Sequence, residues 1–316
     1  MLFDTLLGNQ RIKDQLHQSL RRGRPSHFYV ISGPAGSGKR TLAKLLATAL
    51  MCESTDPPCG RCQGCRKIQS GIHPDFITVD DPEKKTVPVD LIRQARADIY
   101  IQPNEGKKKI YLFPRGQDMG LPSQNALLKI LEEPPSYGVF LLITDNPERL
   151  LPTVRSRCTE LSLQPLPPDL LRRELEERTQ ADPDTITAAM MRSGGYLGQA
   201  LALLEDTDTW PQQTLDLMEA LTTRDTMLLV RTLVPLEKWK RDQLIPLLQQ
   251  WTQLLQEALT CRSTGKALSE QARRLAAARS SQDLLSAIRQ LQKCTDYAQG
   301  NVSCAAICGY LQWTLR

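Results

Sequence analysis

A glycine-rich segment near the N-terminus has the residue types and spacing that hold phosphate. Gly33, Gly36 and Gly38 are followed directly by Lys39. In a phosphate loop, backbone N–H groups at the start of a helix bind the anion, and the glycines allow its close approach. The lysine adds a positive charge for the outer phosphates. A buried-strand pattern precedes the segment and leucines at helical spacing follow it, so the sequence predicts a strand, a phosphate loop and a helix.

The residue after the lysine is wrong for magnesium chemistry. A phosphate loop normally carries Ser or Thr there as a metal ligand, but this chain has Arg40. Arginine has no acceptor atom and brings its own positive charge. Thr41 comes one position late, and a helix turns by about 100° per residue. Two alternatives stay open: a loop that binds ATP or ADP weakly, and a loop that binds neither.

A second strand pattern, residues 109–113, ends without the acids that ATP hydrolysis needs. In ATP-hydrolysing proteins of this design an aspartate supports magnesium and a glutamate polarises the attacking water. Pro114 and Arg115 stand in those places, and neither accepts a proton. We expect Asp118, the nearest carboxylate, to be a solvated loop residue. The sequence therefore predicts no intrinsic ATPase activity.

Four cysteines lie within fourteen residues: Cys52, Cys59, Cys62 and Cys65. The last three are separated by two residues each, which is the spacing of tetrahedral zinc sites. Because the cluster offers four thiolates and no histidine, a closed structural Zn²⁺ site is favoured over a catalytic one. Cys52 is spaced less tightly, and a set of reduced free thiols is the alternative. We expect a zinc module over about residues 52–65.

Alternating strand and helix patterns predict an α/β domain with a mostly parallel sheet. Strand patterns lie at 75–79, 110–113 and 139–144, with helical patterns at 89–97 and 123–131 between them. The near-continuous apolar run at 139–144 is typical of a strand buried on both faces.

The character of the chain changes at the prolines of 164–168, where we expect a linker. No strand pattern follows, so an all-α region is predicted after the α/β domain. We expect three domains: a nucleotide-binding-like domain over 1–165, a small helical lid over 166–208 and a helical oligomerisation domain over 209–316. In the last, apolar residues repeat at spacings of three and four, which predicts a packing face; they are Leu244, Leu247, Leu248, Trp251, Leu254, Leu255 and Ala258.

Composition excludes some classes of protein. With 316 residues, 41% hydrophobic and 24% charged, the chain is too long for one core and too apolar for wholesale disorder. An aromatic content of 5% argues against a base-stacking platform, and a net charge of +5 permits DNA contact without requiring it. The sequence shows no membrane span and no signal-peptide pattern, so we expect a cytoplasmic protein.

Longer motifs carry a resemblance to a known family. The segment 125–135 (NALLKILEEPP), followed by 153–158 (TVRSRC), resembles bacterial clamp loaders of the AAA+ class. Three shorter segments fit the same family: 3–4 (FD) and 7–10 (LGNQ) near the N-terminus, and 73–76 (HPDF) after the cysteines. The resemblance covers the first 165 residues and continues more faintly beyond them. It implies an AAA+ domain, a helical lid and a helical collar in a hetero-oligomeric complex.

The resemblance also implies roles for individual residues. Arg157, with Ser156 in the same motif, is implied to point across a subunit boundary at ATP held by a neighbouring tau/gamma subunit. Such an arginine finger neutralises charge that develops on phosphate oxygens. The implied partners are tau/gamma and delta subunits, with the sliding clamp and primer–template DNA reached through the complex. Arg93 and Arg96 lie where family members approach DNA, and their contacts would be to phosphates.

Our first hypothesis is a subunit that does not hydrolyse ATP but lends Arg157 to a neighbour. The departures at Arg40, Pro114 and Arg115 favour it, as does the lack of the family's sensor arginine in 195–201. The alternative is an ATP-hydrolysing tau/gamma-type subunit with a degenerate site. A third hypothesis, a zinc-dependent nucleic-acid-binding protein, is disfavoured by the low aromatic content and mild charge.

Overall fold

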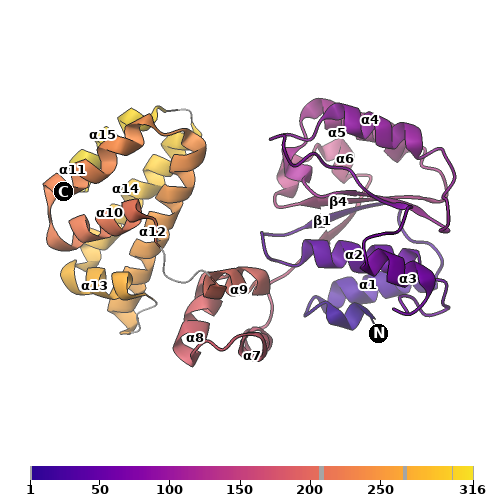
Figure 1. The fold of residues 1–316 in the computed structure, drawn as a ribbon, viewed down its shortest axis with the longest axis horizontal. Helices are drawn as coiled ribbons and strands as arrows, with labels where there is room; N and C mark the ends of the chain where they lie inside the picture. Colours follow the sequence, from indigo (N-terminus) through magenta and orange to yellow (C-terminus); the bar gives the residue numbers. More distant parts are fainter. Residues whose placement is uncertain (1, 206–209, 266–268, 301, 316) are drawn as a thin grey trace. The chain divides into compact units, whose positions relative to one another are not determined.

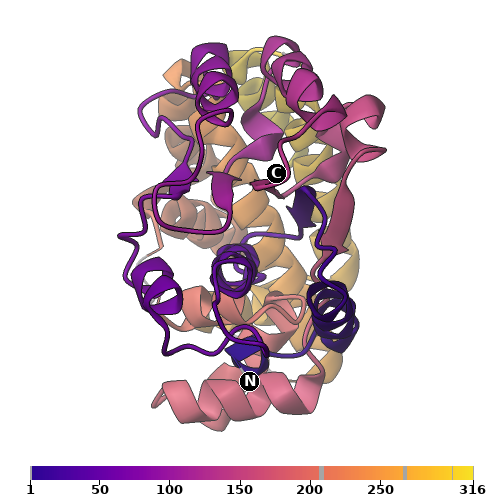
Figure 2. The ribbon, with the colours of Figure 1, turned by 90° about the vertical axis from the view of Figure 1, so that its right-hand side faces the viewer.

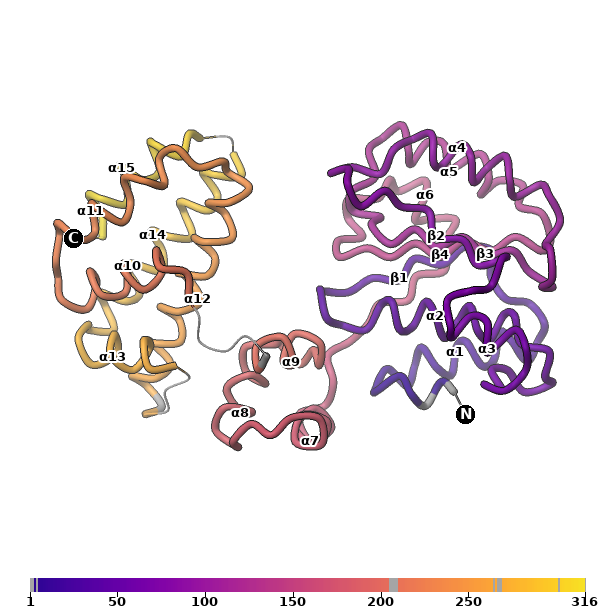
Figure 3. Tube along the Cα trace, viewed as in Figure 1, coloured from indigo at the N-terminus to yellow at the C-terminus, as the bar shows by residue number. Residues whose placement is uncertain are grey.

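The computed structural model describes residues 2–205, 210–265, 269–300 and 302–315 (Figures 1 and 3). The chain divides into two compact units, Met1–Glu205 and Asp206–Arg316. The predicted order, an α/β fold followed by an all-helical region, is confirmed. The finer division into three domains stays a prediction, and its boundary at 208–209 falls outside the described residues. Across those residues, none of the helices combines the length and apolar character that crossing a membrane requires.

The first unit is built on a parallel sheet with the strand order β2-β3-β4-β1-β5. The strands are β1 (Phe28–Ser32), β2 (Phe76–Thr78), β3 (Lys109–Phe113), β4 (Gly138–Thr144) and β5 (Thr159–Ser162). Every residue of β1 and β4 is buried, because helices cover both faces of the sheet. Ser32 at the end of β1 pairs with Thr144 at the end of β4. The loops that follow these strands therefore start side by side at one edge of the sheet.

Helices form a layer on each face of the sheet (Figures 1 and 2). One layer contains α1 (Gln10–Arg21), α2 (Lys39–Leu50) and α3 (Gln63–Gln69), and the other contains α4 (Val89–Asp98), α5 (Leu121–Glu132) and α6 (Pro152–Arg155). Alternate residues of one strand join different cores: Tyr29 and Ile31 join the first, whereas Phe28 and Val30 join the second. This alternation is the period of two that a strand imposes. In the second core, Phe140 stacks on rings from both neighbouring strands.

Three short helices complete the first unit: α7 (Pro168–Arg178), α8 (Pro183–Arg192) and α9 (Leu197–Glu205). They pack around a small core of their own, which includes Leu171, Leu175 and Ile186. Asp182 caps α8, because its side chain accepts hydrogen bonds from two backbone N–H groups of the first turn.

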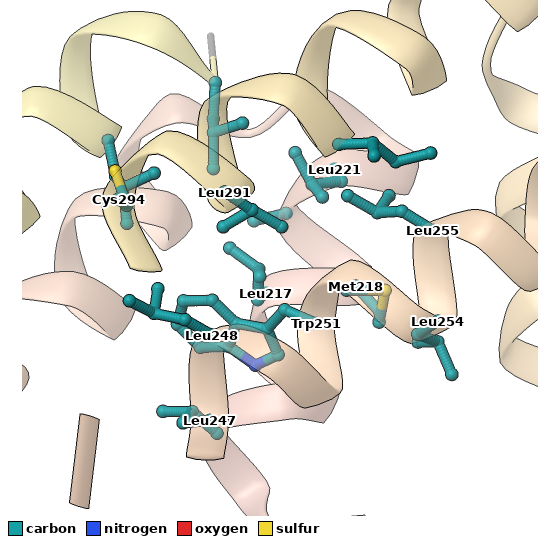
Figure 4. Close-up of a cluster of buried hydrophobic side chains, with 14 of the residues drawn as sticks. Leu217, Met218, Leu221, Leu247, Leu248, Trp251, Leu254, Leu255, Leu291 and Cys294 are labelled. Carbon is teal, nitrogen blue, oxygen red and sulfur yellow. The ribbon is translucent and has the colours of Figure 1, made fainter. Parts of the chain in front are cut away.

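The second unit is entirely helical in its described residues. Its helices are α10 (Gln212–Thr223), α11 (Thr226–Leu233), α12 (Arg241–Thr264), α13 (Glu270–Ala278), α14 (Ser281–Gln299) and α15 (Cys304–Thr314). The apolar stripe of α12 forms its centre, as the spacing predicts. Trp251 is fully buried among leucines (Figure 4), and its indole N–H donates to the Thr214 hydroxyl at 3.1 Å. This bond satisfies the indole's one polar atom inside the core.

Candidate functional site

The glycine segment forms the loop between β1 and α2 that the sequence predicts. Gly33, Gly36 and Gly38 have φ angles of 153°, 72° and 93°. Residues other than glycine rarely adopt these backbone conformations, so the path of the loop depends on all three glycines. Gly38 is the N-cap of α2, and Lys39 is the first residue of that helix.

The lysine of this loop is already fully bonded. Lys39 Nζ donates to the carbonyl oxygens of Gly33 at 2.7 Å and Pro34 at 2.5 Å. It also lies 2.7 Å from Asp145 Oδ1, and its side chain is only 9% exposed. An ammonium group has three N–H donors, and these three acceptors match them in number. A phosphate could reach Lys39 only by displacing one of these partners. We call the Lys39–Asp145 pair the lysine lock.

The space beside the loop is small. A cavity of about 230 Å³ is lined by the loop, the segment before α1 and the start of α9. Its lining includes the polar residues Thr41 and Arg178 and the largely apolar residues Leu6, Tyr196 and Leu201. Pockets for small molecules usually measure about 300–1,000 Å³, so this cavity is below the usual range. Arg40 is exposed and does not line it.

Just beyond the end of β3, the guanidinium of Arg115 lies where ATP-hydrolysing proteins of this design have acidic residues. Arg115 Nε and Nη2 lie 2.8 and 2.7 Å from Asp80 Oδ1, just beyond the end of β2. Nη1 donates to the carbonyl of Lys84, and Nη2 also donates to the carbonyl of Asp81. The hydrogen bond to Asp80 raises the pKa of Arg115. Asp118, expected to be a solvated loop residue, is 29% exposed and lies 3.9 Å from Arg115. This cluster holds its nearby carboxylates in ion pairs.

The predicted finger residue lies on the surface of the first unit. Arg157 follows α6, and its side chain is 42% exposed. Nη1 donates to the Thr153 carbonyl at 3.1 Å, and Nη2 lies 3.9 Å from Glu132. Ser156 Oγ donates to the same Thr153 carbonyl. The long ion pair and the hydrogen bond engage only part of the five N–H donors of the guanidinium.

The two arginines proposed for DNA lie on α4. Arg93 is exposed and pairs with Asp90 at 3.0 Å across one helical turn, and Arg96 is half-buried. Because they are three residues apart, they share one face of the helix.

The four clustered cysteines converge on one point. Their Sγ atoms all lie within 4.8 Å of one another, and those of Cys59 and Cys65 are 3.9 Å apart. A tetrahedral zinc ion with Zn–S bonds of about 2.3 Å sets its sulfurs about 3.8 Å apart. Cys52, the least tightly spaced in sequence, belongs to the group. The geometry fits a structural zinc ion held by four thiolates.

Backbone N–H groups donate to two sulfurs of the cluster, yet burial still raises the pKa of one of them, Cys52. Cys52 Sγ accepts from two backbone N–H groups at 3.3 and 3.4 Å, and Cys59 Sγ accepts from the N–H of Cys62 at 3.4 Å. Hydrogen bonds from Arg61 and Cys62 lower the pKa of Cys59 to about 6, whereas burial raises the pKa of Cys65. Zinc binding therefore has to release protons from Cys52 and Cys65.

Two carboxylates with structural importance were not singled out by the sequence analysis. Asp145 directly follows β4, at the edge where the phosphate loop starts, so its place after a buried strand was an available signal. Asp75 is fully buried and accepts from the backbone N–H groups of Asn104, Glu105 and Gly106 at 2.6–2.9 Å. Burial opposes its ionisation, but these hydrogen bonds outweigh burial and lower the pKa of Asp75.

The sequence matches a known family. Residues 8–167 of the 316 fit the family described as DNA polymerase III, delta subunit. This match spans just over half of the chain, and the chain belongs to that family. It takes in the phosphate loop, the cysteine cluster and Arg157.

Several subunits of DNA polymerase III are similar to this chain in sequence. The tau subunit of DNA polymerase III from Escherichia coli is 34% identical over 64% of this chain and 32% of its own length. The delta' subunits from Escherichia coli and Pseudomonas aeruginosa are 34% and 38% identical, over 62% and 46% of this chain. The matches span 60% and 45% of those two proteins. A gamma subunit-related protein from Thermotoga maritima has a solved structure with a TM-score of 0.46 and 18% identity, over 96% of this chain and 100% of that chain.

The cysteine cluster gives the first prediction. The full-length chain, purified without added metal, will contain about one zinc ion, measured by inductively coupled plasma mass spectrometry. Cys65→Ser will lose the ion and lower the Tm by at least about 5 °C, because zinc binding contributes directly to folding. Cys158→Ser, at a cysteine outside the cluster, will keep the ion. A zinc-free chain whose Tm does not change on adding a chelator would contradict the site.

Proposed function

We propose that this chain is a delta prime-type subunit of the DNA polymerase III clamp loader that does not hydrolyse ATP. Membership of the family supports the clamp-loader assignment. The observation that carries the non-hydrolysing part is the bonding of Lys39, which combines the lysine lock with two hydrogen bonds to its own loop.

Two further features, at Arg40 and Arg115, support the absence of hydrolysis. A hydrolytic site needs a free lysine for the phosphates, a hydroxyl for magnesium and an acid that orients water. Here Lys39 is bonded, Arg40 replaces the hydroxyl, and Arg115 replaces the acid and neutralises Asp80. Each loss alone weakens catalysis, and together they remove the metal site and the base.

The proposed role is that of a fixed partner in a hetero-oligomer. The chain would adjoin a tau/gamma subunit, hold the delta subunit in place during DNA replication, and lend Arg157 to ATP bound by its neighbour. The exposed, weakly paired guanidinium of Arg157 supports this role, because a finger must leave its own surface to reach a phosphate. The sliding clamp and primer–template DNA would be met by the assembled complex.

A second candidate is an ATP-hydrolysing subunit of tau/gamma type. The identity to the tau subunit from Escherichia coli equals that to its delta' subunit, 34% in both cases. Identity therefore does not separate the two types. The arrangement of Lys39, Arg40 and Arg115 favours the non-hydrolysing one.

The finger hypothesis predicts a loss of activity in the neighbour. In a clamp loader reconstituted from this chain with tau/gamma and delta subunits, Arg157→Ala will lower DNA-stimulated ATP hydrolysis by about tenfold. This is less than the 10³–10⁵ known for GTPase fingers, because we expect the other sites to have their own fingers. Arg157→Lys will recover little, since lysine lacks the planar fork. Arg24→Ala, at another exposed arginine, is the control. Unchanged hydrolysis and clamp loading by Arg157→Ala would remove the proposal.

We also propose that Arg93 and Arg96 contact DNA phosphates. Each phosphate contact contributes about one unit to the slope of log K against log salt concentration. Replacing both residues by Ala will therefore reduce the slope of the assembled complex by about two, measured by fluorescence anisotropy on primed DNA. The pair Arg172→Ala/Arg173→Ala on α7 is the control. An identical slope for the α4 variant and the wild type would exclude these contacts.

A further inference from the structure

The phosphate loop makes a direct backbone contact with α9. The Gly198 N–H, in the first turn of α9, donates to the Gly36 carbonyl at 3.0 Å. A loop that holds phosphate in other proteins is here bonded to a helix of its own chain.

The contact is too close for a side chain on either partner. A β-carbon at Gly198 would lie 2.7 Å from the Gly36 oxygen, and one at Gly36 would lie 2.5 Å from the Gln199 nitrogen. Real β-carbons essentially never come within 3.0 Å of such atoms. Gly36 also has a positive φ, but Gly198 does not. For Gly198, close approach is therefore the reason for glycine.

A hydrogen bond and an ion pair on either side of this contact add to it. The Leu166 N–H donates to the Gly195 carbonyl at 2.8 Å, just before α9. On the other side of the loop, the lysine lock joins Lys39 to Asp145 after β4. The loop is thus bonded to the sheet domain through Lys39 and to α9 through Gly36.

We propose that the phosphate loop of this chain works as a fixed joint: the Gly36–Gly198 contact holds α7–α9 to the loop, and the lysine lock holds the loop to the end of β4, without nucleotide. In a nucleotide-binding protein the ligand could bridge two such parts, and their arrangement would follow its presence. Here the backbone contact bridges them. The proposal goes beyond the clamp-loader assignment and does not depend on Arg157.

The test is hydrogen–deuterium exchange on the full-length chain, followed by mass spectrometry of peptides. In the wild type, peptides covering 33–38 and 197–205 will exchange at the same rate with and without magnesium-ATP. Gly198→Ala will speed exchange of both peptides about tenfold, as expected for losing one hydrogen bond and displacing its partners. Peptides from β4 will not change. Gly309→Ala is the matched control, because Gly309 is also helical and a β-carbon there meets nothing within 4 Å.

Several outcomes would overturn the proposal of a fixed joint. One is that Gly198→Ala exchanges like Gly309→Ala in both peptides, and another is that magnesium-ATP protects the wild-type loop. If Gly198→Ala also loses protection in β4, Asp145→Ala replaces it as the test variant. Releasing Lys39 will then speed exchange in 33–38 and in 197–205 together, whereas a change confined to 33–38 would overturn the proposal. Failure of the Arg157 experiment would leave these results unaffected.

Discussion

The bonding of one ammonium group, that of Lys39, is central to the phosphate loop of the first unit. The ammonium group of Lys39 has three N–H donors. Three oxygen atoms lie at hydrogen-bond distance from it: two carbonyl oxygens of its own loop and one carboxylate oxygen of Asp145. In this chain a phosphate would have to compete with a carboxylate and two carbonyls at hydrogen-bond distance.

The strand order makes this arrangement possible. β4 lies between β3 and β1, so the residue after β4 is next to the loop after β1. The same edge brings Asp80, after β2, to Arg115, after β3. Arg115 and Asp80 form an ion pair there, so the carboxylate of Asp80 is bound to a cation of its own chain. Both ion pairs are inside the chain, so neither leaves an uncompensated charge at the edge.

Much of the architecture could be predicted from the sequence. Local hydrophobic patterns predicted three features: the apolar run of β4, the strand–loop–helix pattern and the apolar stripe of α12. Such patterns depend only on residues close together in the sequence. The grouping of the four cysteines followed from their spacing. The partners of Lys39, Arg115 and Gly36 could not be predicted in this way. Asp145, Asp80 and Gly198 lie far from them in sequence, and only the order of the strands and the position of α9 bring them together. Gly198 carried no signal, because glycine at a helix start has several ordinary explanations.

The most direct test of the account is steady-state ATP hydrolysis by the purified chain, measured with magnesium beside Lys39→Ala. Because Lys39 is held by its own chain and the metal and base positions are lost, we expect no turnover above background in either protein. Turnover in the wild type that disappears in Lys39→Ala would contradict the account. It would show that Lys39 leaves Asp145 to bind phosphate, and the chain would then be an ATPase of the tau/gamma type.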